Sequence, residues 1–230
     1  YDGYVESFTE NWEKLEQYDN NAPKTMNAHL HVLEAYTLLY QCWKDNGLKK
    51  RLEFCVDLFM NRIYDPSRKH FNLFFDNEWN SLVEMDSYGH DVETGWLLCE
   101  AARTLENQDL IEQTNQLALD VTEACLAEGM SDKGYMIYEK KGDRKTKHAS
   151  WWGQIETVIA CVNAWQISGS DVYLQSVDTV WTFVKDHMVD KEYGEWYSDC
   201  FDGEPKKEAP KVSMWRCPYH TVRLGVEMYN

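Results

Sequence analysis

The sequence predicts an all-α fold in which pairs of helices form a ring, an α/α toroid with short β-hairpins in its loops. Two observations support this prediction. Helix pairs alternate with extended aromatic segments along the chain. Polar motifs at the starts of alternate helices recur after 59, 62 and 68 residues, counted from His31 through His90 and Trp152 to His220. Tetratricopeptide and ankyrin repeats are shorter, at about 34 and 33 residues. We therefore expect a single domain over residues 1–230.

The first helix pair follows a connecting segment. Residues 1–23 carry aromatic and charged residues without a clear period. From Lys24 the apolar residues recur at helical spacing until Asn46-Gly47, which is a helix stop signal. A second helix is expected over Leu48–Ile63, because Tyr64-Asp65-Pro66-Ser67 ends its apolar stripe. The two helices are expected to form an antiparallel hairpin.

The order of helix, helix and extended segment then recurs twice. Further helices are expected over 88–106, 108–128, 151–168 and 171–187. Short β-hairpins or ordered loops are expected near residues 70–80, 134–139 and 193–197, where aromatic residues stand beside turn signals. A fourth unit begins at Cys217. The pattern therefore describes three helix pairs and the start of another.

Composition limits the class of partner. A formal net charge of −16 argues against nucleic acid and against an anionic membrane, since phosphate surfaces repel an acidic protein. No apolar run approaches the roughly 20 residues that span a bilayer. The seven cysteines are scattered singly, which is typical of a reducing compartment. We expect a soluble, cytoplasmic, monomeric protein that binds a small molecule.

The candidate site begins with His90 and Glu93, three residues apart at the start of an expected helix. That spacing puts the imidazole and the carboxylate on one face. His31 and Glu34 repeat the motif, and His220 stands at a third helix start. Histidine suits acid and base work at neutral pH because its ordinary pKa is about 6.5. We expect these helix starts to converge on one pocket.

A metal centre is the main competing interpretation of the histidines. His29, His31, His90 and Glu93 supply nitrogen and oxygen ligands of the kind zinc binds. Residues two apart on a helix face about 200° apart, so His29 and His31 cannot both point inward. We therefore predict no metal and no cofactor.

Aromatic and amide residues indicate a sugar as the ligand. Trp151, Trp152 and Trp215 lie at or just before helix starts, where the C–H faces of sugars stack on indole rings. Asn27 and Glu156 stand on expected inner helices, where hydroxyl recognition needs a few placed donors and acceptors. Most of the other aromatic residues are expected to fill the core.

Three stretches, Asn27–Tyr36, Tyr88–Glu93 and Trp215–His220, resemble the cellobiose 2-epimerases of the N-acylglucosamine 2-epimerase superfamily. The resemblance implies an (α/α)6 barrel. The family's chains are longer, so this chain corresponds to their C-terminal part, roughly four of six helix pairs. The N-terminal pairs, and an active-site arginine that the family carries there, are expected to be missing from residues 1–230.

The resemblance also implies roles for residues. His90 and His220 are implied as the two acid/base residues on opposite faces of the sugar, and His31 as a third that assists at O1 and O2. The implied chemistry needs no cofactor: the ring opens, one histidine removes the C2 proton, and a cis-enediolate is reprotonated from the other face. The implied substrate contacts are Asn27, Glu93, Trp152, Glu156 and Trp215.

Other functions remain open at this point. The same site suits a mannose or N-acylglucosamine epimerase, or an aldose–ketose isomerase. An inactive sugar-binding fragment is a second possibility. A glycoside hydrolase needs two carboxylates flanking the scissile bond, which Glu93 and Glu156 could supply. It leaves the three histidines without a role, so we rank it below epimerisation.

Overall fold

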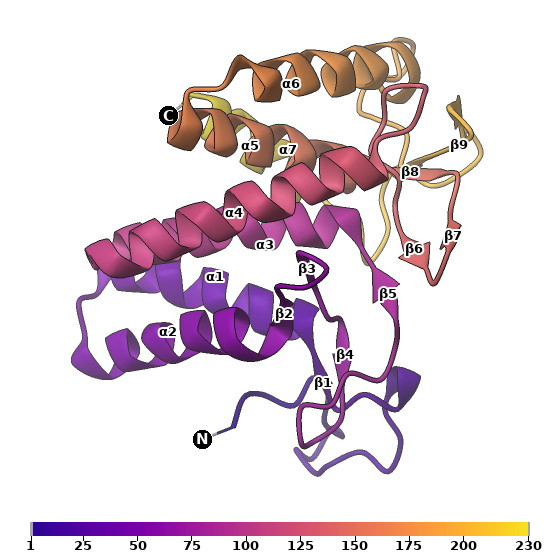
Figure 1. The fold of residues 1–230 in the computed structure, drawn as a ribbon. Coiled ribbons are helices and arrows are strands. Elements are labelled where there is room, and N and C mark those ends of the chain that lie inside the picture. The colour runs from indigo at the N-terminus through magenta and orange to yellow at the C-terminus, as the bar shows by residue number, and fades with distance from the viewer. Residues whose placement is uncertain (1, 230) are drawn as a thin grey trace. The chain divides into compact units, whose positions relative to one another are not determined.

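A computed structural model describes residues 2–229 of the chain (Figure 1). Seven α-helices lie in this described range, and the strands are only two or three residues long, so the predicted all-α class is confirmed. The helices are α1 (Met26–Cys42), α2 (Asn46–Leu58), α3 (Tyr88–Thr104), α4 (Gln108–Gly129), α5 (Trp151–Ser168), α6 (Asp171–Phe183) and α7 (Tyr219–Tyr229). The segment before α1 contains a bridge from Phe8 to Lys14, a 3-10 turn at Asp19–Asn21 and a two-residue strand next to the helix.

Apart from the first strand, which precedes α1, the strands lie in the loops between helices, as predicted. They are β1 (Lys24–Thr25), β2 (Tyr64–Asp65), β3 (His70–Phe71), β4 (Phe74–Phe75), β5 (Met85–Asp86), β6 (Lys140–Lys141), β7 (Arg144–Lys145), β8 (His148–Ser150), β9 (Asp199–Phe201) and β10 (Glu204–Pro205). The antiparallel pairs include β2–β3, β6–β7 and β9–β10, while β8 joins the other edge of β9.

The extended segments differ in detail from the prediction. Strands β3 and β4 pair with the earlier β2 and β1, and a single antiparallel bridge from Phe75 to Ser81 closes an ordered turn at residues 76–80. Residues 134–139 and 193–197 contribute single bridges, from Met136 to Met130 and from Trp196 to Val189. The hairpins follow directly after them, because the glycine turns at Gly142 and Gly203 reverse the chain there.

The chain divides into two compact units. The first contains the residues up to Asp86 together with Leu97–Thr114, and the second contains Ser87–Trp96 together with the chain from Asn115 onward. The division passes through α3 and α4. The prediction of a single domain over residues 1–230 remains a prediction.

In the first unit, α1 packs against α2. Each helix begins at a side-chain cap: the Thr25 Oγ1 accepts from the Ala28 N–H, and the Asp45 carboxylate accepts from the Leu48 N–H. The facing stripes are fully buried, including Leu30, Leu33 and Leu52. Helix α2 continues into a π-helical turn, Phe59–Ile63. The helical segment therefore ends at the predicted residue, Ile63, but its last turn is wider than an α-helical one.

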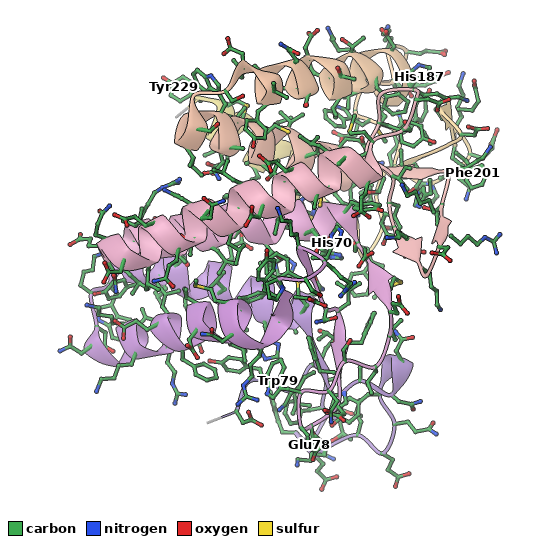
Figure 2. All side chains as sticks on the ribbon, viewed as in Figure 1. His70, Glu78, Trp79, His187, Phe201 and Tyr229 are labelled. Carbon is green, nitrogen blue, oxygen red and sulfur yellow. The ribbon has the colours of Figure 1, made fainter. Side chains whose placement is uncertain are left out.

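His29 fastens the N-terminal segment to α1. Its ring is fully buried, its Nε2 accepts from the Tyr4 N–H at 2.9 Å, and its Nδ1 donates to the Thr25 carbonyl at 2.6 Å. The Trp79 ring, which is labelled in Figure 2, packs on it at 5.1 Å and donates from Nε1 to Asp2. These contacts require neutral His29, because a protonated ring has no acceptor for Tyr4. Burial lowers the pKa of His29, and the nearby Lys24 ammonium lowers it further.

This arrangement makes the first unit sensitive to acid. Because the folded-state pKa of His29 lies below its unfolded value of about 6.5, the unfolded chain binds more protons below that pH. The stability is therefore fully present above pH about 6.5 and falls as the pH drops through it. Urea unfolding of wild type and His29→Gln above and below this pH should show the larger acid loss in wild type. An equal loss in both proteins contradicts the assignment.

In the second unit, α5 packs against both α6 and α7 (Figure 1). Helix α5 is buried along nearly its whole length, and Cys161 and Ala164 form a core cluster with Tyr173 of α6. Ser150 caps its start and Gly169, with φ of 69°, ends it, so the predicted bounds 151–168 are met. Helix α6 also ends in a π-helical turn, Val184–Met188.

Within residues 2–229, none of the helices combines the length and apolar character needed to cross a membrane.

Candidate active site

Three helix starts in the second unit bring the candidate side chains together. Helix α3 supplies His90 and Glu93, α5 supplies Trp152 and Glu156, and α7 supplies His220 and Arg223. Each pair is three or four residues apart and so shares one helix face. The contacts described below join the three faces into one cluster.

The Trp152 indole contacts both imidazoles. The His90 ring lies 4.6 Å from it, tilted by 52°, and the His220 ring lies 5.7 Å away in a stacked arrangement. The close approach of α3 to α5 depends on Gly89, because a Cβ at that position would lie 2.7 Å from the Trp152 ring. One aromatic surface therefore sets the positions of two potential proton carriers.

Glu156 orients His220. Its carboxylate is fully buried and accepts from the His220 Nδ1 at 2.6 Å. It also accepts from the Trp96 Nε1 at 2.9 Å. Since a carboxylate only accepts, the hydrogen of neutral His220 is assigned to Nδ1. The other ring nitrogen, Nε2, then carries the lone pair.

His90 is held through the same ring nitrogen. Its Nδ1 lies 2.8 Å from the hydroxyl of Ser87, the residue just before α3. A hydroxyl either donates or accepts, so this contact suits both tautomers of His90. The two imidazoles are thus both anchored at Nδ1.

Arg223 links the two carboxylates of the cluster. Its Nη1 donates to Glu93 at 2.7 Å and to Glu156 at 3.1 Å. The guanidinium also lies over the Tyr219 ring at 4.2 Å and the Trp96 ring at 5.3 Å. The sequence reasoning assigned no role to Arg223 or Trp96. The spacing of His220 and Arg223 on α7, matching that of His90 and Glu93 on α3, is the signal that could have found the arginine.

Tyr138 and His148 flank the cluster and were also not predicted. The Tyr138 ring stands edge-on to Trp152 at 6.0 Å and tilts against His148 at 4.8 Å. His148 Nε2 lies 2.6 Å from the Asp199 carboxylate, across the pairing of β8 with β9. Burial raises the pKa of Tyr138, and the neighbouring carboxylates of Glu139 and Asp199 add to this. Tyr138 is therefore held as a neutral phenol beside the indole.

Trp215 lies on the surface of the second unit, 83% exposed. It belongs to a tight turn in which Ser213 and Arg216 exchange backbone hydrogen bonds. The Arg216 side chain anchors this turn, because its Nη2 donates to the Trp196 carbonyl at 2.5 Å and its guanidinium lies over Trp151. Burial lowers the pKa of Arg216. The predicted stacking residue is thus presented by an anchored loop.

A family model described as N-acylglucosamine 2-epimerase matches residues 2–223. The chain belongs to this epimerase family.

Relatives of known name agree with this assignment. The cellobiose 2-epimerase of Bacteroides fragilis is 40% identical over 98% of this chain and 59% of its own length. The solved cellobiose 2-epimerase of Bacillus thermoamylovorans B4167 superposes with a TM-score of 0.93 at 35% identity, covering 98% of this chain and 59% of that one. A sugar epimerase from a ruminal bacterium gives 0.94 at 34%, covering 98% and 60%. The chain therefore spans about three fifths of these relatives' lengths.

Membership of the epimerase family also confirms the predicted fold class. The solved relatives are (α/α)6 barrels, so α1–α2, α3–α4 and α5–α6 are helix pairs of that fold, and α7 begins another.

The remaining predicted residues of this family member lie in the first unit. Asn27 and His31 are on α1, where Asn27 is half-buried and His31 is exposed with its Nδ1 3.2 Å from Glu34. His29 and His31 do point in different directions, as the helical spacing requires, since His29 is fully buried. That His31 and Asn27 join His90 and His220 in one site remains a prediction.

The carboxylates of Glu93 and Glu156 and the His220 imidazole are the residues of the epimerase cluster that could hold a cation. Ligand atoms of the three lie within 4.8 Å of one another. The Arg223 guanidinium already bonds both carboxylates and supplies the positive charge there. A metal ion bound by these carboxylates would have to replace the Arg223 guanidinium or lie beside its positive charge. The donor set therefore fits a metal poorly.

Proposed function

We propose that the protein is a sugar 2-epimerase that inverts C2 of the reducing-end glucose in β-1,4-linked disaccharides, converting cellobiose to glucosyl-mannose. The observation that carries the proposal is a pair of imidazoles, His90 and His220, that both pack against the Trp152 indole. Each is anchored at Nδ1, by Ser87 and by Glu156 respectively. Family membership and the named cellobiose 2-epimerases support it.

Inversion at C2 needs two groups that carry protons on opposite faces of the sugar. After the reducing-end ring opens, one imidazole Nε2 removes the C2 proton next to the aldehyde, and the electron pair forms a cis-enediolate. The other imidazole, protonated, returns a proton to C2 from the opposite face. His90 and His220 come from helices 130 residues apart, which gives them separate attachments around the indole.

The other residues bind and orient the sugar in this proposal. Trp152 offers its face to the ring, while the buried carboxylates of Glu93 and Glu156 hold Arg223, and Glu156 also holds His220. His31, Asn27 and Trp215 complete the contacts, with His31 assisting at O1 and O2. Proton return to C1 in place of C2 converts the same intermediate into a ketose, so epimerisation and isomerisation are two outcomes of one site.

Hydrolysis is less compatible with this geometry. A glycoside hydrolase needs one protonated and one ionised carboxyl group. Glu93 and Glu156 both accept from the Arg223 guanidinium, and Glu156 also accepts from His220 and Trp96, so both carboxylates are already used as acceptors. The cluster then lacks a protonated acid for the leaving oxygen.

The test is the fate of the C2 hydrogen in deuterated water. Cellobiose incubated with the full-length protein is expected to give glucosyl-mannose with deuterium at C2, because the proton returned by a histidine exchanges with solvent. The position of the label is read by NMR. Parallel assays on mannose and N-acetylglucosamine distinguish the related epimerases and isomerases. Epimer formation without deuterium at C2 argues strongly against a two-base reaction.

A further inference from the structure

The guanidinium of Arg223 lies between two buried carboxylates. Glu93 is 1% exposed and Glu156 is fully buried, and both bond the same nitrogen, Nη1. Arg223 itself is 8% exposed. Three helices therefore contribute one cation and two anions, with His220 bonded to one of the anions.

Two carboxylates so close together do not both stay ionised without a cation. Removing the guanidinium leaves like charges in a desolvated space, which favours the uptake of a proton by one carboxylate. If Glu156 takes the proton, its hydroxyl donates to the His220 Nδ1. The hydrogen of neutral His220 then moves to Nε2, and the ring loses the lone pair that acts as a base.

We propose that Arg223 is a positioning residue that keeps Glu156 ionised and thereby holds His220 in the tautomer with its hydrogen on Nδ1. The catalytic part of this inference rests on the proposed function, whereas the tautomer does not. Arg223 bonds both carboxylates and acts through Glu156, which accepts from His220 at 2.6 Å. Partners that fix the tautomer of a metal-ligating histidine contribute about 10- to 100-fold to activity, and we expect an effect of at least this order for His220.

The geometry favours arginine over lysine at this position. The planar guanidinium bonds two carboxylates while its face lies 4.2 Å from the Tyr219 ring. An ammonium keeps the charge and loses the stacking. The Lys variant is therefore expected to retain more activity than a neutral variant of similar length.

The experiment compares Arg223→Met, Arg223→Lys and the double variant Glu93→Gln/Arg223→Met in the full-length protein. The His220 tautomer is read by 15N NMR of the imidazoles, assigned with His220→Gln. The Met variant is expected to move the hydrogen from Nδ1 to Nε2 and to lower kcat by about 100-fold with a smaller change in KM. The Lys variant is expected to keep the wild-type tautomer.

The double variant separates charge balance from packing. It lacks the guanidinium but also one of the two negative charges, so Glu156 is expected to stay ionised and the Nδ1–H tautomer to return. A purely structural role for Arg223 predicts that the double variant is no better than the Met variant. Wild-type tautomer in the Met variant overturns the inference. Absence of epimerase activity in the wild type overturns the proposed function alone, because the tautomer is measured without substrate.

Discussion

Replacing either His90 or His220 by alanine is expected to lower the rate of epimerisation by about 10²- to 10⁴-fold, the usual contribution of a placed acid or base. Both imidazoles lie against Trp152, and each is oriented through Nδ1, so each variant removes one proton carrier and leaves the other in place. Loss of epimerisation in both variants is the first expected result.

The variants should differ in solvent exchange. A protein with one base left still removes and returns the C2 proton on one face, so it exchanges deuterium into one epimer without converting it. His90→Ala and His220→Ala are expected to label opposite epimers of the disaccharide, measured by NMR in deuterated water. Labelling of the same epimer by both contradicts the placement of the bases on opposite faces.

His187→Gln provides the matched control for these histidine variants. His187 lies in the π-helical turn after α6, packs on Phe183, and is labelled in Figure 2. It belongs to the same unit as the candidate site but is not among the cluster residues. Its replacement is expected to leave the rate and the exchange pattern at wild-type values.

Replacing Glu156 by leucine is expected to lower the free energy of unfolding by about 3–5 kcal/mol, the usual result of removing one partner from a buried ion pair. The buried carboxylate accepts from three side chains, namely Trp96, His220 and Arg223. Leucine leaves those donors without this acceptor in a desolvated space. Urea unfolding followed by circular dichroism measures the change.

Glu208→Leu is the control for this stability effect. Glu208 is exposed, and an exposed substitution usually changes stability by no more than about 0.5 kcal/mol. Glu156→Gln should fall between the two, because its amide oxygen keeps one acceptor. A Glu156→Leu protein as stable as the Glu208→Leu protein shows that the buried network contributes little.

Much of the fold could be predicted because several helices carry local start and stop signals, although Asn46-Gly47, read as a stop, begins α2. Ser150 and Gly169 bound α5 at the predicted residues. The π-helical turns after α2 and α6 were not predicted, since one wider turn barely changes an apolar stripe. The pairing of the two-residue strands could not be predicted for a different reason. Strand β4 pairs with β1, some 50 residues earlier, and such a short pairing leaves no local sequence pattern.

The site was predictable in part. Helical spacing places His90 with Glu93 and Trp152 with Glu156 on common faces, and the structure brings these residues together with His220 in one unit. Spacing does not say which faces meet across the repeat, so the bonds from Arg223 to Glu93 and Glu156 were missed. Those contacts depend on the packing of α7, a helix whose position only tertiary structure determines.

The buried position of Glu156 limits how the repeats of this barrel can be exchanged. Helix pairs with similar backbones look like interchangeable modules, yet the carboxylate on α5 takes its donors from α3 and α7. A chimaera that brings in α7 from another α/α barrel without an equivalent of His220 and Arg223 leaves a buried charge uncompensated. Recombination within this fold is therefore expected to preserve α3, α5 and α7 as one block, and their sequences to change together.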